Sequence, residues 1–261
     1  MINIDKYAYN SKLKKVSVIR KLLFSLFALG ICIWADSIAI SVFIALIMIL
    51  VTYKKGEVPL GFILKLMLVP FVFLLMSTLA ITIEITRPEN LSERMFILSG
   101  SIAGLQIGAT IEGIKDALNI FFKALGTISC LYFLSLSTPM LELMAVLRKL
   151  KVPKLLIELM GLTYRFIFIL LETAENIFVS QRARLGYEGL SSGFRSVKIL
   201  FSSLFIRSFK RSDEIYRSLE ARGYDGELNF LEEEIRFCCK DVINPAMFAF
   251  LMVLLTLSLK E

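Results

Sequence analysis

The 261-residue sequence contains no histidine. This absence excludes histidine metal ligands, histidine general bases and Ser-His-Asp triads. The chain also lacks the G-x-x-x-x-G-K-[ST] loop that cradles nucleotide phosphates. No paired acid and base or nucleophile constellation stands out either. We therefore expect a chain that is not an enzyme, with no catalytic residues and no cofactor of its own.

Cysteine is scarce, with four residues and no C-x-x-C pair. Cys32 and Cys130 lie inside apolar runs, so we expect them to be buried small hydrophobic residues and not metal ligands. We place the adjacent Cys238 and Cys239 near a bilayer surface that faces the cytosol. The cysteines therefore predict neither a metal site nor a disulfide framework.

Charge is also scarce, at 20% of the residues, against 56% hydrophobic residues and a mean hydropathy of +0.71. Soluble domains carry about a quarter charged residues, and here the charges are segregated. These values predict a multi-pass protein of the cell membrane, embedded in a lipid bilayer. The net charge of +7 fits the excess of Lys and Arg on cytoplasmic loops. Because no basic stripe is interleaved with aromatics, we expect no nucleic-acid partner.

Five apolar stretches predict an all-α protein with about five transmembrane helices. The stretches are residues 22–35, 38–53, 62–83, 117–137 and 241–259. The first two predict a tight hairpin, because one long helix would carry Asp36 at its apolar centre. The basic residues of segment 1–21 predict a cytoplasmic lead and not a signal peptide, since no small-residue cleavage site follows. Five spans then place the N-terminus inside and the C-terminus outside.

Residues 84–112 carry few basic residues and the glycine-rich run G-S-I-A-G-L-Q-I-G-A-T. Glycines of this density can allow close helix approach in a membrane. We favour a flexible external connection instead, because a helix with so many glycines is weak.

Residues 139–240 hold more than half of the chain's 30 Lys and Arg and of its 23 Asp and Glu. We interpret them as a cytoplasmic coupling-helix region between the transmembrane helices of residues 1–138 and the last transmembrane helix, 241–261. The pattern predicts helices over 140–150, 154–183 and 194–221, the last of them amphipathic.

The apolar part of the middle helix, residues 155–172, leaves two possibilities open. Glu158 and Arg165 favour a buried or interfacial helix, while a sixth span remains the alternative.

Two Ala-Arg tripeptides end the last two of these helices. The residues are Ala183, Arg184 and Leu185 in the first, and Ala221, Arg222 and Gly223 in the second. An arginine fork matches a carboxylate, and a helix C-terminus tolerates a cation, so each tripeptide suits an acidic groove on a partner. One such tripeptide is explained more simply by capping and a solvated charge. Two at successive helix ends favour a two-pronged contact with a two-lobed partner. Neighbouring candidates for support are Arg182, Gly186, Tyr187 and Tyr224.

Nearly the whole chain resembles the transmembrane T component of energy-coupling-factor transporters, in the cobalt-type (CbiQ-like) branch. The resemblance rests on I-D-K-Y-A-Y (4–9), T-P-M-L-E-L-M (138–144), L-K-V-P (150–153), Y-R-F-I-F (164–168), R-A-R (182–184) and R-S-F-K-R-S-D-E-I-Y-R-S-L-E-A-R-G-Y-D-G (207–226). It implies a scaffold bound by two ATP-binding cassette ATPase subunits, which hydrolyse the ATP, and by a substrate-binding membrane S component. It also implies that Arg184 and Arg222 each enter a groove of one ATPase.

The first tripeptide departs from the family's pattern, because Leu185 stands where glycine is more usual and Gly186 comes one place later. Arg182 is therefore a candidate to share the role of Arg184. The resemblance favours cobalt ion as cargo, with nickel or a vitamin as alternatives. A self-contained membrane carrier is the alternative of a different class, and it would need polar residues facing a pore.

Overall fold

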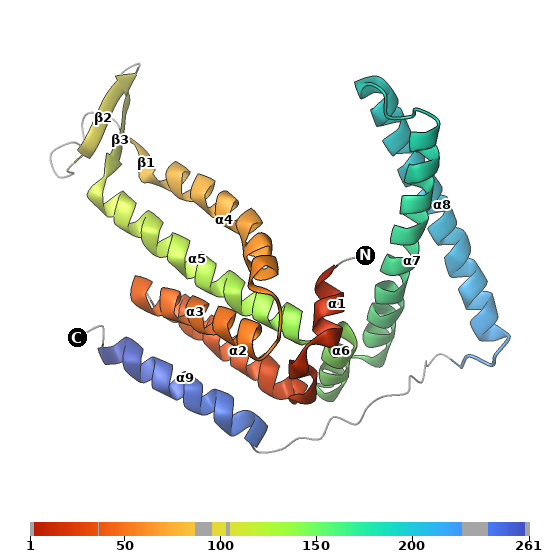
Figure 1. Ribbon diagram of the computed structural model, residues 1–261, viewed down its shortest axis with the longest axis horizontal. Coiled ribbons are helices and arrows are strands. Elements are labelled where there is room, and N and C mark those ends of the chain that lie inside the picture. The colour runs from red at the N-terminus through yellow and green to blue at the C-terminus, as the bar shows by residue number, and fades with distance from the viewer. Residues whose placement is uncertain (1–2, 36, 87–95, 103–104, 226–239, 259–261) are drawn as a thin grey trace. The chain divides into compact units, whose positions relative to one another are not determined.

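The computed structural model describes residues 3–35, 37–86, 96–102, 105–225 and 240–258 (Figure 1). The chain divides into two compact units, one of residues 2–139 with 235–261 and one of residues 140–234. Helices make up most of the described residues, so the predicted all-α membrane class is confirmed. The Cys238–Cys239 pair lies outside the described residues.

The first unit is built around one long helix, α5, which contacts α1, α2, α3 and α4, while α9 packs against α2. Its helices are α1 (Asn3–Asn10), a 3-10 turn (Lys12–Lys15), α2 (Val18–Trp34), α3 (Ile38–Lys54), α4 (Leu60–Thr82), α5 (Ile111–Ser137) and α9 (Lys240–Ser258). Because α2 ends at Trp34 and α3 begins at Ile38, the predicted hairpin is confirmed and the single long helix is excluded.

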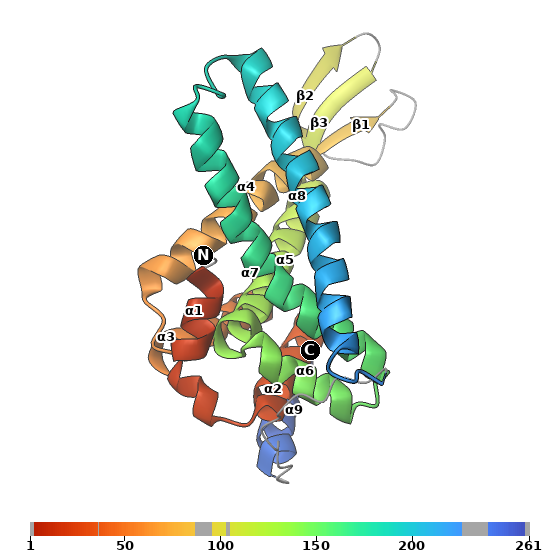
Figure 2. The same ribbon diagram turned by 90° about the vertical axis from the view of Figure 1, so that its right-hand side faces the viewer.

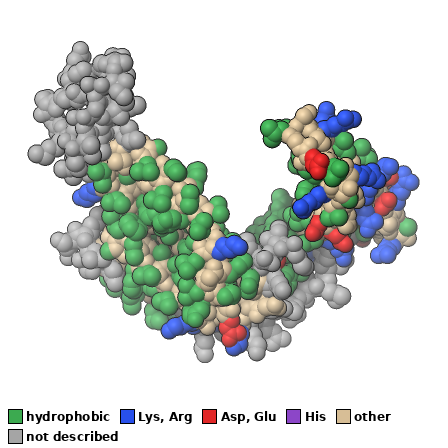
Figure 3. Space-filling model, turned by 45° about the horizontal axis from the view of Figure 1, so that its top comes forward, with side chains coloured by type: hydrophobic (Ala, Val, Ile, Leu, Met, Phe, Trp, Pro, Cys, Tyr) green, Lys and Arg blue, Asp and Glu red, His purple; other side chains and the backbone are tan. Residues whose placement is uncertain are grey.

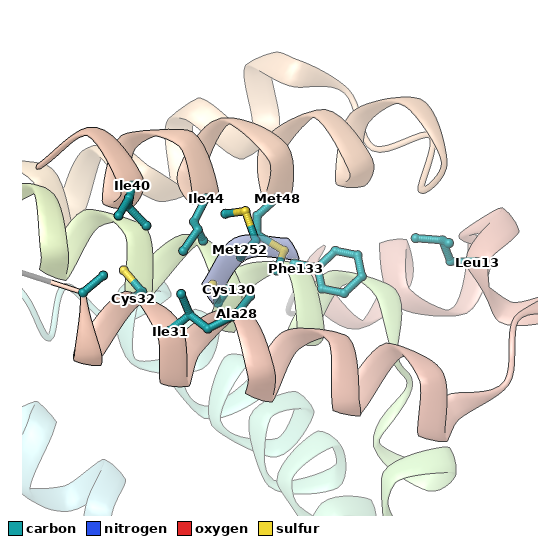
Figure 4. Close-up of a cluster of buried hydrophobic side chains, with 11 residues drawn as sticks. Leu13, Ala28, Ile31, Cys32, Ile40, Ile44, Met48, Cys130, Phe133 and Met252 are labelled. Atoms are coloured by element: carbon teal, nitrogen blue, oxygen red, sulfur yellow. The ribbon is translucent and has the colours of Figure 1, made fainter. Parts of the chain in front are cut away.

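Apolar side chains from α2, α3, α5 and α9 form the core of this unit (Figure 4). Its most buried members are Ala28, Cys32, Ile40, Ile44, Met48, Cys130 and Met252. Cys32 and Cys130 are free and fully buried, as predicted.

Polar groups between these helices are paired inside the apolar core. The Ser25 hydroxyl donates to the Cys130 carbonyl oxygen over 2.9 Å, and Lys21 Nζ donates to the Ser137 carbonyl oxygen over 2.9 Å. Gly126 permits the close approach of α2 and α3 to α5, because a Cβ there would lie 2.7 Å from Cys32 Sγ and 2.9 Å from the Ser41 carbonyl oxygen. Small residues and paired polar groups are what helix packing in a membrane requires.

The outer surface of this unit is apolar. In α4 the buried residues are Ile63 and Met67, whereas Val69 and Phe73 are 72% and 70% exposed. Figure 3 shows hydrophobic side chains covering much of the visible face over α4. Two described helices are long and apolar enough to cross a bilayer, Leu60–Thr82 and Gly113–Ser137, and Ile38–Lys54 and Pro245–Leu254 are shorter apolar helices. Such a surface fits lipid as its solvent.

The expected flexible connection over residues 84–112 is wrong for its described part. Three strands occupy it, β1 (Ile83–Thr86), β2 (Phe96–Ile102) and β3 (Leu105–Thr110), in an antiparallel sheet of order β1-β3-β2. Ile83 pairs with Ala109, and Ser99 pairs with Gly108. The β-branched residues Ile83, Ile85 and Thr86 in β1, and Ile107 and Thr110 in β3, favour strands despite the glycines. The helix that follows, α5, accordingly begins at Ile111, six residues before the expected start.

The second unit contains α6 (Met140–Lys149), α7 (Lys154–Ala183) and α8 (Leu190–Glu220). α6 packs against α7, and α7 packs against α8; Figures 1 and 2 show α7 and α8 side by side at their connecting turn. The bounds of α7 match the prediction, while α8 begins four residues earlier than expected. α7 is not among the described helices that are long and apolar enough to cross a bilayer. The buried residues of α7 are Ile157 and Glu158, and the interpretation of residues 155–172 as a buried or interfacial helix stays a prediction.

Candidate functional site: two arginine-bearing helix ends

The C-terminus of α7, which we call the first arginine end, closes with a left-handed residue directly after Arg184. Leu185 has a φ of 60°. Its N–H donates to the Arg182 carbonyl oxygen over 3.0 Å, and the Gly186 N–H donates to the Gln181 carbonyl oxygen over 2.9 Å. These two bonds are the Schellman closure of a helix, with Leu185 at the position that glycine usually fills.

The C-terminus of α8, the second arginine end, closes in the same way after Arg222. Gly223 has a φ of 76°. Its N–H donates to the Glu220 carbonyl oxygen over 3.0 Å, and the Tyr224 N–H donates to the Leu219 carbonyl oxygen over 3.0 Å. Arg222 therefore has the same backbone setting as Arg184.

This equivalence shows how the two tripeptides correspond. Leu185 takes the conformation of Gly223, and Gly186 takes the place of Tyr224, so the departure at Leu185 leaves the closure intact. Arg182 lies two residues earlier, where the second arginine end has Glu220. Arg184, and not Arg182, is thus the geometric counterpart of Arg222.

Both arginines are exposed, and neither pairs with a carboxylate among the residues that the structure describes. Two arginines within α8 do pair with carboxylates. Arg211 pairs with Glu214 over 3.1 Å, and Arg217 pairs with Asp213 over 3.0 Å, each within the helix.

At the second arginine end, the Glu220 carboxylate raises the pKa of exposed Tyr216, four residues earlier, by accepting a hydrogen bond and by its charge. The surroundings of Arg222 therefore carry negative charge on its own helix, whereas its guanidinium stays available.

The turn between α7 and α8 contains a set of side-chain hydrogen bonds, the turn network, that the sequence did not reveal. Gln181 Oε1 accepts from the Tyr187 hydroxyl over 2.7 Å, and Gln181 Nε2 donates to the Ser196 carbonyl oxygen over 3.0 Å. The Gly186 carbonyl oxygen accepts from Ser196 Oγ over 2.6 Å and from Ser192 Oγ over 3.0 Å. Only Tyr187 and Gly186 were candidates from sequence; the i,i+4 spacing of the two serines was the available signal for the rest.

The fold and the site together define an α-helical membrane protein with a helical hairpin unit that bears two equivalent, exposed arginines. The family described as cobalt transport protein (CbiQ) matches residues 10–231. The chain therefore belongs to this family and is a transmembrane component of a transporter.

The chain is also similar to individual proteins along much of its length. An uncharacterised protein of Methanocaldococcus jannaschii is 28% identical over 258 residues, which are 99% of this chain and 94% of the relative. The cobalt transport protein CbiQ of Salmonella typhimurium is 34% identical over 164 residues, 62% of this chain and 71% of that protein. The energy-coupling factor transporter transmembrane protein EcfT of Staphylococcus aureus is 27% identical over 224 residues, 80% of this chain and 78% of EcfT. The resemblance to a cobalt-type T component is thereby confirmed.

Proposed function

We propose that this chain is the coupling (T) subunit of an energy-coupling-factor importer, and that Arg184 and Arg222 each insert into an acidic groove on one of two ATP-binding cassette subunits. The observation that carries the proposal is the matched closure of the two arginine ends. The two ends are separated by α8, whose 31 residues at 1.5 Å per residue extend about 46 Å. One helix thus links two distant contact points, which is the arrangement that a two-lobed partner needs.

The chemistry of the arginine ends supports such a contact. Both guanidinium groups are exposed, and their planar fork matches a carboxylate bidentately. The preceding residues, Ala183 and Ala221, are small and exposed, so a partner's surface can approach the backbone. Removing one arginine from an acidic groove costs about 2–5 kcal/mol of binding free energy, in part because the partner's carboxylates are left unpaired. At about 1.4 kcal/mol per tenfold, the lower bound alone weakens assembly roughly 30-fold.

The mechanism follows from these contacts. ATP binding closes the ATPase pair, and each arginine end moves with the lobe that holds it. α7 and α8 transmit the movement as packed helices to an S component, which then reorients in the membrane. An aromatic stripe on α8 supports a contact of this kind, because Phe201, Phe205 and Phe209 lie at i, i+4 and i+8 and are 67%, 72% and 72% exposed.

In the membrane we propose five spans, with residues 139–240 in the cytoplasm, where ATP is available. Cobalt ion is the proposed cargo, because relatives of this chain carry the name cobalt transport protein. Nickel and a vitamin are the alternatives, and a competition assay with each one against labelled cobalt separates them.

The test is uptake of labelled cobalt by cells that express the transporter with Arg184→Ala, Arg222→Ala or both, together with co-purification of the ATPases. We expect each single variant to lose coupled uptake and to weaken co-purification while the protein stays in the membrane. Arg211→Ala is the matched control, since Arg211 is also exposed on α8 but pairs with Glu214; it is expected to behave as the unmodified protein.

Two outcomes would contradict the proposal. Unchanged uptake and unchanged ATPase binding in the double variant would show that the two arginines take no part in coupling. Transport by the purified chain alone in liposomes would establish a self-contained carrier instead.

A further inference from the structure

The first arginine end is tied to the helix that follows it. It has the same backbone closure as the second arginine end. It also has the turn network, which joins the last turn of α7 to the first turns of α8. The α7–α8 turn is therefore a junction between two helices as well as an arginine end.

Gln181 is the centre of the turn network. Its backbone carbonyl oxygen accepts from the N–H groups of Arg184 over 3.2 Å and of Gly186 over 2.9 Å, so it sets the backbone on both sides of Leu185. Its side chain accepts from Tyr187 and donates to the Ser196 backbone in α8. One residue therefore fixes the backbone of Arg184 and ties it to the next helix.

Packing reinforces these bonds. The Tyr187 ring lies against the Phe178 ring of α7, with centroids 4.9 Å apart. Gly186 fits tightly under α8, because a Cβ there would lie 2.7 Å from Ser196 Oγ and 2.9 Å from the Gln181 carbonyl oxygen. Ser196 is buried. The hydrogen bonds of the turn network are part-buried, and linked bonds that are shielded from water stiffen such a junction.

We propose that Gln181, Tyr187 and Ser196 are positioning residues for Arg184, which hold it rigidly against α8 so that a displacement at Arg184 reaches the far end of α8 without being absorbed by the turn. The proposal rests on the proposed coupling function. It adds that stiffness in this turn, and not binding of Arg184 alone, sets how much cargo moves for each ATP hydrolysed. The network residues touch neither cargo nor nucleotide; they act through Arg184.

Tyr187→Phe is the primary test, because it removes the hydroxyl that donates to Gln181 and keeps the ring that packs on Phe178. Gln181→Leu removes both side-chain bonds of the central residue. The reconstituted complex with its ATPases is assayed for labelled cobalt uptake, ATP hydrolysis and ATPase binding. The expected result is normal binding and continued hydrolysis, with uptake per ATP reduced about fivefold, the effect of losing one net hydrogen bond.

Two controls separate a mechanical role from a merely structural one. Tyr53→Phe removes a phenol hydroxyl from an exposed position on α3, outside the turn network and both arginine ends, and is expected to leave uptake per ATP unchanged. Ser196→Thr, which keeps the hydroxyl that donates to Gly186, is expected to retain more coupling than Ser196→Ala.

The outcomes are distinguishable from failure of the proposed function itself. If Arg184→Ala disrupts assembly but Tyr187→Phe and Gln181→Leu transport normally per ATP, the positioning role is refuted and the arginine contact stands. If the network variants lose ATPase binding in the same proportion as uptake, the network only maintains the docking surface, and the proposal also fails.

Discussion

Exchanging the residue types at the two left-handed positions tests the closure of the arginine ends most directly. Leu185 and Gly223 have φ values of 60° and 76° and occupy the same place after an arginine. Leu185→Gly removes a side chain from a conformation that costs an L-residue about 1–2 kcal/mol. Gly223→Leu introduces the same cost at the other end.

The change in the free energy of each closure can be estimated because the two substitutions alter few other contacts. The Leu185 side chain is 63% exposed, so its loss forfeits little burial. At Gly223 no heavy atom lies within 4 Å of an added Cβ, so a side chain there meets open space. Glycine in place of leucine gives the unfolded chain more conformational freedom, which destabilises the folded protein by about 0.5–1 kcal/mol. The net expectation is a gain of about 0.5–1 kcal/mol for Leu185→Gly and a loss of similar size for Gly223→Leu, from the difference of these terms.

Hydrogen exchange at the closing amides is the assay, carried out on the protein in detergent or nanodiscs. The Leu185 and Gly186 N–H groups close the first end, and those of Gly223 and Tyr224 close the second. After correction for intrinsic rates, protection should rise about two- to fivefold at the first end and fall by a similar factor at the second, since about 1.4 kcal/mol is tenfold. Faster exchange after Leu185→Gly, or no change after Gly223→Leu, would refute the reasoning.

Two further substitutions have clear expectations. Gly126→Ala forces a Cβ to within 2.7 Å of Cys32 Sγ and is expected to destabilise the membrane unit by about 1–3 kcal/mol in detergent melts, whereas Gly30→Ala, with nothing within 4 Å, should not destabilise it. Equal effects of the two would show that α2 and α3 do not depend on close approach at α5. Asp213→Asn breaks the exposed pair with Arg217 and is expected to change stability by no more than about 0.5 kcal/mol and uptake not at all. A large loss of uptake would mean that Asp213 takes part in a contact with another chain.

Helix bounds were predictable where the chain itself marks them. Pro153 precedes the first residue of α7, and the predicted range of 154–183 matches that helix. For α8 the sequence offers two glycines four residues apart. The structure uses Gly189, with a φ of 105°, as the N-cap, and the Gly193 N–H donates to the Gly189 carbonyl oxygen over 2.9 Å inside the first turn. The sequence alone does not show which of the two glycines lies at the start of the helix.

Neither the sheet nor the turn network could be predicted from the sequence, because both depend on contacts between different elements. Strands β1 and β3 pair residues such as Ile83 and Ala109, which lie far apart in the chain, and the pairing compensates for glycines that are weak in isolation. Likewise, the Gln181 side chain donates to the Ser196 carbonyl oxygen only because the start of α8 packs beside the end of α7. The left-handed backbone of Leu185 was also not predictable, for a different reason: leucine rarely takes positive φ. Local sequence patterns indicate candidate residues, but contacts between distant parts of the chain determine their hydrogen-bond partners.

The helix closure also bears on why an arginine at a helix end suits a buried contact. The last four carbonyl oxygens of a helix lack partners inside it, and burying them unpaired in another protein's groove is costly. At the first arginine end the closing N–H groups satisfy the carbonyl oxygens of Gln181 and Arg182, and at the second they satisfy those of Leu219 and Glu220. A partner therefore has fewer backbone groups to satisfy and can devote its carboxylates to the guanidinium. If the proposed function is right, we therefore expect residues 185 and 223 to contribute to assembly together with Arg184 and Arg222.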